Sequence, residues 1–294
     1  MLELTNITHR YPGAETPALQ GIDLQLQAGQ CLGLLGSNGA GKTTLLSLLA
    51  GVLPLQQGEI RWDGERSLGL VPQQLAFYAE LKVRENLELF ADLYRLRGAE
   101  RARRLELCIA STSLESKLQR RAGRLSGGEQ RRLNFAIGLL QPARLYLFDE
   151  ATVGVDASSR QRLLGAVEQL TAEGHAVIYT SHYLDEVERV AQRILLLHQG
   201  HVRLDLDSRQ LLGDDHGLLL EWQGEEPAGL RELLGKLHLN AEALPGGLRI
   251  ASLDGPQLLE ITRFLAERPE LPHLLRFGRP SLEQLYLRLN GGRL

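Results

Sequence analysis

The residues best suited to chemistry form the run Gly36-Ser37-Asn38-Gly39-Ala40-Gly41-Lys42-Thr43, which fits the pattern G-x-x-x-x-G-K-[ST]. Backbone N–H groups of such a loop surround nucleotide phosphates. Glycine at positions 39 and 41 permits a close approach that a Cβ would prevent. We expect Lys42 to reach the β- and γ-phosphates and the Thr43 hydroxyl to bind Mg²⁺. The expected phosphate-binding residues are Gly36, Ser37, Asn38, Gly39, Ala40, Gly41, Lys42, Thr43 and Thr44.

Two adjacent carboxylates supply the other half of the expected chemistry. Asp149 and Glu150 follow the apolar run Leu145–Phe148. An acid at this place can hold the Mg²⁺ of a phosphate-loop ATPase, and the next carboxylate can orient or deprotonate the attacking water. Adjacent acids at a strand end are often only solvated. With a phosphate loop upstream the metal needs a partner, so we interpret this pair as catalytic.

These groups need strands and helices that position them. Residues 31–35 predict a short buried strand that leads into the phosphate loop, and residues 43–49 predict a helix after it. Residues 145–148 and 176–179 predict two further buried strands, each ending at polar residues. Functional groups at the carboxyl ends of strands are typical of a doubly wound α/β sheet.

We predict two domains. Residues 1–212 hold every phosphate-related motif, with an α-helical insert over about residues 80–125. Residues 213–217 are predicted to be a linker, and residues 213–294 a small α+β accessory domain. Its expected elements are a strand at 218–223, a helix at 228–237, two strands through 253, a helix at 257–267, a strand at 274–277 and a closing helix at 281–290. Apart from the closing helix, this order resembles a ferredoxin-like βαββαβ unit.

Composition narrows the classes of function. The 294 residues can form two domains with their own cores. The net charge of −3 gives no bulk attraction to nucleic acid, and the arginine clusters at 101–104 and 131–132 are interpreted as solvated helix faces. Cys31 and Cys108 are interpreted as reduced core residues of a cytosolic protein. We expect no secretion leader and no membrane span, so a pore would belong to another polypeptide.

A second motif, Leu125-Ser126-Gly127-Gly128-Glu129, makes a chance match to the phosphate-loop pattern negligible. With it, residues 2–200 resemble the ATP-binding-cassette (ABC) ATPases. The resemblance implies the fold of a P-loop NTPase, ATP and Mg²⁺ as cofactors, and ATP hydrolysis. In that family Ser126, Gly127 and Gly128 match the signature that caps the γ-phosphate of ATP on the opposite subunit, which implies a head-to-tail dimer with a second copy.

The resemblance also assigns single residues. Gln73 matches a glutamine that touches the metal and senses the transport partner. Asp156 matches an aspartate at the dimer seam, His182 a switch histidine at the γ-phosphate, and Tyr11 lies where the family stacks an aromatic ring on adenine. The implied set is catalytic Lys42, Glu150 and His182; nucleotide-binding Tyr11, Gln73, Ser126, Gly127, Gly128, Glu129 and Asp156 with the phosphate loop; and metal-binding Thr43, Gln73 and Asp149.

Two positions depart from the family pattern. Ala151 stands where a proline usually follows the glutamate, and Val155 replaces a common leucine. Neither change removes a polar group from the reaction, so hydrolysis should survive. Losing the proline can soften this loop and alter cooperativity between two sites.

Sequence matches that are less specific than the catalytic motifs indicate the branch of the family. Residues 81–87, 90–94 and 281–289 resemble the ATPases of type-2 exporters for drugs, polysaccharides and natural products. This resemblance implies an energising subunit, peripheral at the cytoplasmic face of a membrane, with a separate permease. Direct contact with the cargo or with nucleic acid is not expected.

Three alternatives stay open. One is the ATPase of an importer. Another is a soluble ABC ATPase acting on ribosomes or DNA, although ribosomal forms usually carry two cassettes and DNA-repair forms long coiled coils. A phosphate-loop GTPase or kinase would leave the motif at 125–129 unexplained, and the sequence has no Asn-Lys pair for reading guanine.

Overall fold

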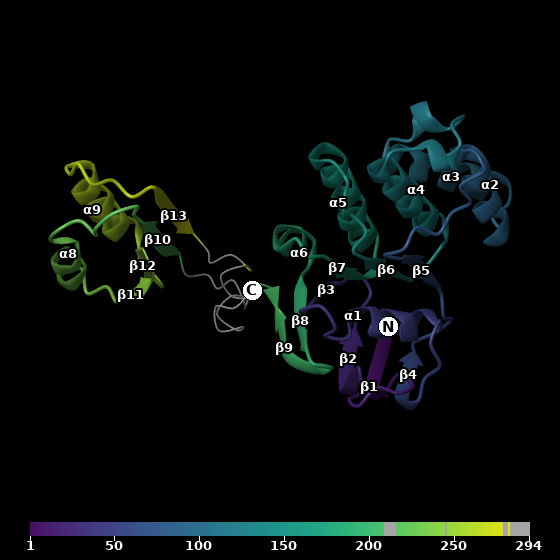
Figure 1. The fold of residues 1–294 in the computed structure, drawn as a ribbon, viewed down its shortest axis with the longest axis horizontal. Helices are drawn as coiled ribbons and strands as arrows, with labels where there is room; N and C mark the ends of the chain where they lie inside the picture. Colours follow the sequence, from purple (N-terminus) through teal and green to yellow (C-terminus); the bar gives the residue numbers. More distant parts are fainter. Residues whose placement is uncertain (209–215, 245, 279–281, 283–294) are drawn as a thin grey trace. The chain divides into compact units, whose positions relative to one another are not determined.

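A computed structural model describes residues 1–208, 216–244, 246–278 and 282 of the chain. The fold divides into two compact units, Met1–Ser208 and Arg209–Leu294 (Figure 1). The predicted boundary between residues 212 and 213 and most of the predicted linker lie outside the described residues.

The first unit is built on a six-stranded sheet. Its strands, in spatial order, are β5 (Leu68–Val71), β6 (Leu145–Asp149), β7 (Ala176–Thr180), β3 (Cys31–Leu35), β8 (Arg193–His198) and β9 (His201–Asp207). All neighbours are parallel except β8 and β9. Every residue of β3, β6 and β7 is buried, because helices cover both faces of a parallel sheet. The three strands predicted from apolar runs are confirmed.

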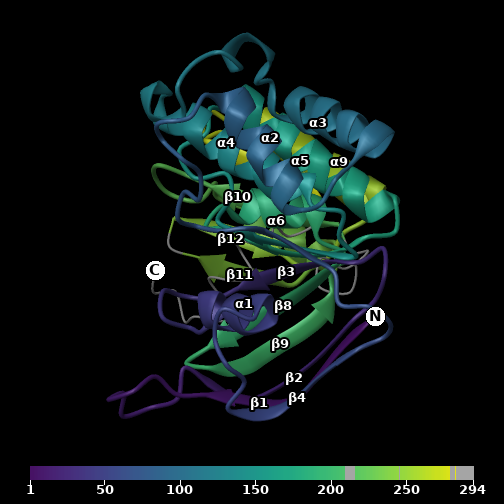
Figure 2. The same ribbon diagram turned by 90° about the vertical axis from the view of Figure 1, so that its right-hand side faces the viewer.

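A second, antiparallel sheet completes this unit on the side of α1. It has the order β2-β1-β4, with β1 at Leu2–His9, β2 at Leu19–Leu26 and β4 at Gln57–Trp62. Helix α1 (Lys42–Ala50) lies between the two sheets (Figures 1 and 2). Apolar side chains of α1, β1, β2 and β3 form one core there. This core fixes the helix that follows the phosphate loop.

Helices cover the opposite face of the main sheet (Figure 1). They are α2 (Val83–Leu93), α3 (Gly98–Thr112), α4 (Gly127–Leu140), α5 (Ala157–Ala172) and α6 (Leu184–Val190), with 3₁₀ turns at Glu115–Lys117 and Ala122–Arg124. The α-helical insert therefore consists of α2, α3 and the two turns. It packs on α4, which begins within the second motif.

The arginine clusters are not simply solvated faces, and that expectation is wrong for three residues. Arg104 donates to the carbonyl of Leu139 at 3.0 Å, and Arg132 to that of Thr112 at 3.0 Å. Arg131 donates to a carbonyl in the segment after β5. Carbonyls in the last turn of a helix lack partners within the helix. Long arginine side chains on neighbouring helices satisfy two of them here.

The second unit, described by itself, has the predicted βαββαβ order. Its elements are β10 (Gly217–Glu221), α8 (Leu230–Lys236), β11 (Ala241–Leu244), β12 (Gly247–Ile250), α9 (Gly255–Ala266) and β13 (Leu274–Gly278). The strand order β11-β12-β10-β13 is fully antiparallel, as in a ferredoxin-like unit. Apart from residue 282, the predicted closing helix lies outside the described residues.

Other expectations concern membranes and thiols. Among the described residues, no helix combines the length and the apolar character that crossing a bilayer requires. Cys31 and Cys108 are both buried and unbridged. Burial raises the pKa of the Cys108 thiol to about 12, so this cysteine stays protonated and unreactive.

Candidate functional site

The phosphate loop joins β3 to α1 at the carboxyl edge of the parallel strands. Ser37, Asn38 and Gly39 are exposed, while Ala40 and Lys42 are buried beside them. The N-terminus of α1 points unpaired N–H groups and the positive end of its dipole at this loop, which favours a bound anion. The loop therefore has the geometry of a phosphate cradle.

Two glycines of this loop are required for different reasons. A Cβ on Gly41, whose φ is +108°, would lie 2.5 Å from the carbonyl oxygen of Ala18. A Cβ on Gly39, whose φ is +78°, would meet no atom of the described residues within 4 Å. Gly41 therefore serves packing within the chain, which the sequence did not reveal, whereas Gly39 leaves space on the exposed side of the loop.

Lys42 folds back over the loop. Its Nζ donates to the carbonyl of Gly36 at 2.6 Å and to that of Ser37 at 3.2 Å. Burial lowers the pKa of the Lys42 ammonium, and the carboxylates of Glu150 and Asp149 oppose this shift. Lys42 therefore lies close enough to Asp149 and Glu150, the predicted acidic pair, for their charges to act on it.

Next to Lys42, the threonines of the loop differ in exposure. Thr43 is exposed, and Thr44 is buried with its Oγ1 at 3.2 Å from the hydroxyl of Tyr11. The Tyr11 ring is 41% exposed and stands edge-on to His9, with 5.1 Å between ring centroids. The structure thus holds Tyr11 beside the start of α1. Its contact with adenine stays a prediction.

Asp149 and Glu150 end β6 and are bound to the end of β7. The hydroxyl of Thr180 donates to Oδ1 of Asp149 at 2.9 Å, and the backbone N–H of Glu150 points at the same hydroxyl at 3.1 Å. Glu150 has a φ of +50°, which is uncommon for a residue other than glycine. Thr180, which the sequence analysis missed, therefore holds both carboxylate residues in place.

The side chain of Glu150 joins residues from two distant loops. One carboxylate oxygen lies 2.7 Å from Nε2 of His182, and the other accepts from Nε2 of Gln73 at 2.8 Å. Glu150 is buried, whereas the His182 side chain is 46% exposed. Three residues that the sequence predicted separately are thus in direct contact.

The segment that carries Gln73 is held by α4. Arg131 donates to the backbone carbonyl of Gln73. The buried side chain of Asn134 donates to the carbonyl of Pro72 at 3.0 Å and accepts from the N–H of Ala76 at 2.8 Å. Helix α4 therefore fixes the backbone on both sides of Gln73. Asn134 was missed, although a lone amide within an apolar helix is a usable signal.

The second motif forms the beginning of α4. Ser126 caps the helix, since its Oγ accepts from the N–H of Glu129 at 3.3 Å and its N–H donates to the Glu129 carboxylate at 2.9 Å. The Lys117 ammonium at 2.7 Å and this backbone bond lower the pKa of Glu129. In the part of the chain that the structure describes, no hydrogen bond or ion pair joins this motif to the phosphate loop.

Gly128 and Asp156 connect the motif to the loop after Glu150. A Cβ on Gly128 would lie 2.9 Å from the carbonyl oxygen of Gly154, so the start of α4 touches this loop within one chain. Asp156 caps α5 by accepting from the N–H of Ser159 at 3.0 Å and from the Ser158 hydroxyl at 2.8 Å. These bonds lower the pKa of Asp156.

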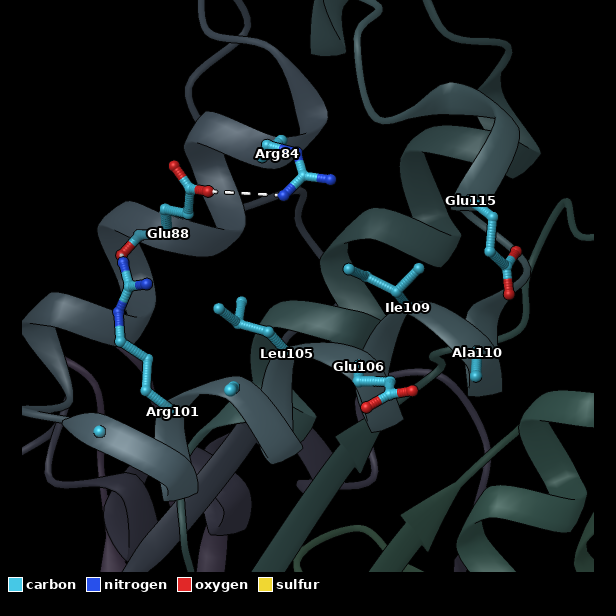
Figure 3. A pocket seen from close by; sticks show the side chains of 10 residues that line it. Arg84, Glu88, Arg101, Leu105, Glu106, Ile109, Ala110 and Glu115 are labelled. Carbon is cyan, nitrogen blue, oxygen red and sulfur yellow. Dashed lines mark hydrogen bonds and ion pairs between the residues drawn. The ribbon is translucent and has the colours of Figure 1, made fainter.

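Two hollows of this unit lie apart from the phosphate loop, and neither is lined by Lys42, Glu150 or His182. One, of about 560 Å³, lies between α2 and α3, and Figure 3 shows Leu105 and Ile109 lining it opposite the pair Arg84–Glu88, whose charged atoms are 3.8 Å apart. The other, of about 570 Å³, borders Pro72 and lies beside the Gln73 segment. Neither carries the chemistry of the phosphate loop.

The donor chemistry of the site fits a magnesium nucleotide. Thr43, Gln73 and Asp149 offer oxygen atoms, which Mg²⁺ prefers, and in nucleotide sites this ion is bound by one or two carboxylates together with phosphate oxygens and water. Among the described residues, no group of three or more His, Cys, Asp and Glu side chains could hold a metal ion alone. Fold and site together define a nucleotide-binding α/β domain with a phosphate loop.

Comparison with known proteins agrees with this class. A family model described as "ABC transporter" matches residues 19–153. The chain is 34% identical to the linearmycin resistance ATP-binding protein LnrL of Bacillus subtilis, over 99% of this chain and 98% of that protein. It is 32% identical to the Nod factor export ATP-binding protein I of Burkholderia thailandensis, over 93% and 92%.

Solved structures agree as well. The dimeric post-hydrolysis structure of the ATP-binding cassette MJ0796, bound to ADP and Pi, matches with a TM-score of 0.65 and 25% identity, over 71% of this chain and 99% of that one. The chain belongs to the ATP-binding proteins of ABC transporters. It binds ATP and is an ATP hydrolase.

Proposed function

We propose that this chain powers export through a separate membrane permease, by binding and hydrolysing ATP at two sites that a head-to-tail dimer of the chain shares. The contact of Glu150 with Gln73 and His182, beside Lys42, is the observation that carries this proposal. The names of two relatives, one for linearmycin resistance and one for Nod factor export, support the export direction.

The proposed hydrolysis divides its tasks among these residues. Lys42 compensates the charge of the β- and γ-phosphates, and Tyr11 stacks on adenine. Glu150 orients the attacking water and takes its proton, while His182 contacts the γ-phosphate. Thr43, Gln73 and Asp149 would hold Mg²⁺, which would supply polarisation of the phosphate oxygens when bound.

The second motif acts across the dimer in this proposal. Ser126, Gly127 and Gly128 cap the γ-phosphate of the ATP bound to the partner, so ATP holds two copies together and hydrolysis releases them. Outside its own helix, a Cβ on Gly127 would meet no atom of the described residues within 4 Å, which leaves this side of the motif open. The dimeric state of the MJ0796 cassette supports this arrangement.

The proposed permease contact lies beside Gln73. The hollow of about 570 Å³ is bordered by Pro72, Phe90 and Tyr94. Val52 at its rim is 69% exposed. A hollow with both apolar and polar lining, next to the segment that holds Gln73, suits a segment of a permease, whose docking would displace that residue. The chain would then sit on the cytoplasmic face of the membrane without touching cargo or nucleic acid.

Glu150→Gln tests the hydrolytic part of the proposal. This change keeps the shape of the side chain but removes the proton acceptor, so ATP should bind, hydrolysis should fall by about 10²- to 10⁴-fold, and an ATP-bound dimer should accumulate. The measurements are phosphate release and gel filtration with ATP and Mg²⁺. Glu168→Gln, on the exposed face of α5, is the matched control.

Two outcomes would contradict the proposal. A Glu150→Gln protein that stays monomeric under saturating ATP and Mg²⁺ would count against the shared sites. For the transport role, the tagged chain should co-purify with a polytopic protein from detergent-solubilised native membranes. Recovery with ribosomes or DNA-repair factors instead would refute the exporter role.

A further inference from the structure

Helix α6 carries a buried carboxylate that none of the proposed steps uses. Glu186 lies four residues after His182 and has no exposed surface. Its Oε2 accepts from the hydroxyls of Ser181 at 2.6 Å, Thr152 at 2.7 Å and Tyr179 at 2.9 Å. An ionised carboxylate only accepts, and these distances are those of charge-assisted bonds.

The charge of Glu186 is balanced only in part. Nε of Arg160 lies 3.3 Å from Oε1 of Glu186, without the geometry of a hydrogen bond. The guanidinium of Arg160 also lies over the ring of Tyr183, 4.4 Å from its centroid. Removing a carboxylate from water costs several kcal/mol even when it is paired, and an apolar side chain of similar size is often more stabilising. A role beyond core packing therefore explains Glu186 better.

Two of the three hydroxyls belong to the loops of the proposed hydrolytic residues. Thr152 comes two residues after Glu150, and Ser181 comes directly before His182. The Ser181 oxygen also accepts from the N–H of Tyr183 at 3.0 Å, which closes a turn around His182. The Glu186 carboxylate thus binds both loops close to Glu150 and His182, whose side chains lie 2.7 Å apart.

The backbone of Glu150 needs such support. A residue other than glycine with a positive φ is strained and persists where its surroundings determine it. Thr180 holds the N–H of Glu150 on one side, and the bond from Thr152 to Glu186 anchors the chain on the other. Without the second anchor, the loop could turn Glu150 away from His182.

We propose that Glu186 is a positioning residue for ATP hydrolysis, which ties the loop of Glu150 to the loop of His182 through Thr152 and Ser181. The proposal rests on the roles assigned above to Glu150 and His182. Glu186 itself is buried away from solvent and does not touch ATP. Because a misplacement of about 1 Å can cost ~100-fold in rate, loss of either tie should act on the rate of hydrolysis more than on ATP binding.

Removing one hydroxyl at a time tests this role in the full chain. Thr152→Val and Ser181→Ala each delete one donor to Glu186 and keep the carboxylate. Thr112→Val is the matched control, because Thr112 is as buried as Thr152 (1% and 0% exposed) and its hydroxyl bonds only within α3. We expect kcat to fall by about 10- to 100-fold in both test variants, with KM for ATP changed less than ~3-fold.

Glu186→Gln is the second test, because it keeps the size of the side chain while removing its charge. We expect the same loss of kcat with a nearly unchanged KM. Thermal unfolding of all four variants separates this effect from general destabilisation. If Glu186→Gln fails to fold, the two hydroxyl variants still decide the question.

The outcomes separate the positioning role from the proposed function. The positioning role is refuted if Thr152→Val and Ser181→Ala keep kcat within ~2-fold of the unmodified chain, or if Thr112→Val loses as much kcat as they do. Glu150→Gln is the reference: if it hydrolyses ATP at the unmodified rate, the assigned role of Glu150 fails, and the positioning role fails with it. If Glu150→Gln is inactive while the hydroxyl variants are fully active, only the positioning role fails.

Discussion

Two alanine substitutions in the phosphate loop should have different effects on folding and on ATP binding. Gly41→Ala places a methyl group 2.5 Å from the Ala18 carbonyl oxygen and 2.7 Å from Leu19 Cδ2, on a backbone with φ of +108°. The left-handed backbone alone costs an alanine about 1–2 kcal/mol. Displacing the backbone carbonyl of Ala18 should bring the loss to about 2–4 kcal/mol.

Gly39→Ala keeps the backbone cost but has no neighbour to displace. Its φ is +78°, and the new methyl group meets no protein atom within 4 Å. We therefore expect a loss of about 1–2 kcal/mol from the left-handed backbone. If phosphates lie against this glycine, the methyl group should still lower ATP affinity at least ~10-fold, because it occupies the space of close approach.

Thermal unfolding and nucleotide titration give the two readouts. For a unit of about 200 residues, 1 kcal/mol shifts Tm by ~2–4 °C, so Tm should fall by about 4–16 °C in Gly41→Ala and about 2–8 °C in Gly39→Ala. Gly174→Ala is the control for backbone cost, since it has a φ of +91° and open space on the surface turn before β7. It should match Gly39→Ala in Tm and keep full ATP affinity.

The packing role of Gly41 and the approach of phosphates to Gly39 are tested separately. A Gly41→Ala protein with the same Tm as the Gly174→Ala control would refute the packing role of Gly41. A Gly39→Ala protein with unchanged ATP affinity would show that phosphates do not approach that side of the loop.

Further expectations concern Lys42 and Glu129. Lys42→Ala should weaken ATP binding at least ~10-fold in a titration, because a buried cation beside the phosphates is lost, and unchanged affinity would remove Lys42 from the site. Lys117 and the cap of α4 lower the pKa of Glu129, so its stabilisation is present above the usual pKa of glutamate and is lost as the pH falls through the lower, folded-state pKa. Glu129→Gln should therefore cost about 0.5–1 kcal/mol in urea unfolding at neutral pH and little in strong acid, whereas an equal cost at both pH values would contradict the ionic contribution.

Much of the fold was predictable because its signals are local. The apolar runs that became β3, β6 and β7 are continuous and end at polar residues, as buried parallel strands do. In the second unit, the predicted order of strand, helix, two strands, helix and strand is the order found from β10 to β13. The phosphate loop was recognisable because glycine, lysine and threonine stand at fixed spacing in such loops.

Part of the candidate site was not predictable, because it depends on tertiary contacts. Glu186 lies in the run Leu184–Val190, which is rich in acids and resembles a solvated helix face. The approach of β7, the loop after β6 and Arg160 of α5 buries it. Arg131 likewise looked like a surface charge until α4 was placed against the Gln73 segment. The charge pattern of one helix cannot reveal which of its faces another loop will cover.

The contact between Gly128 and Gly154 has a consequence for timing between the two sites of the proposed dimer. Gly128 would contact the partner's ATP, and the space between Gly128 and the Gly154 carbonyl oxygen is too small for even a Cβ, which would lie 2.9 Å from that oxygen. A shift of α4 toward this loop would therefore move the loop that follows Glu150 in its own chain. A shift caused by the nucleotide at one site would therefore reach Glu150, the water-activating residue of the other site, through this close approach. Two ATP sites linked in this way would hydrolyse ATP in turn, because the nucleotide at one site would set the position of the water-activating residue at the other.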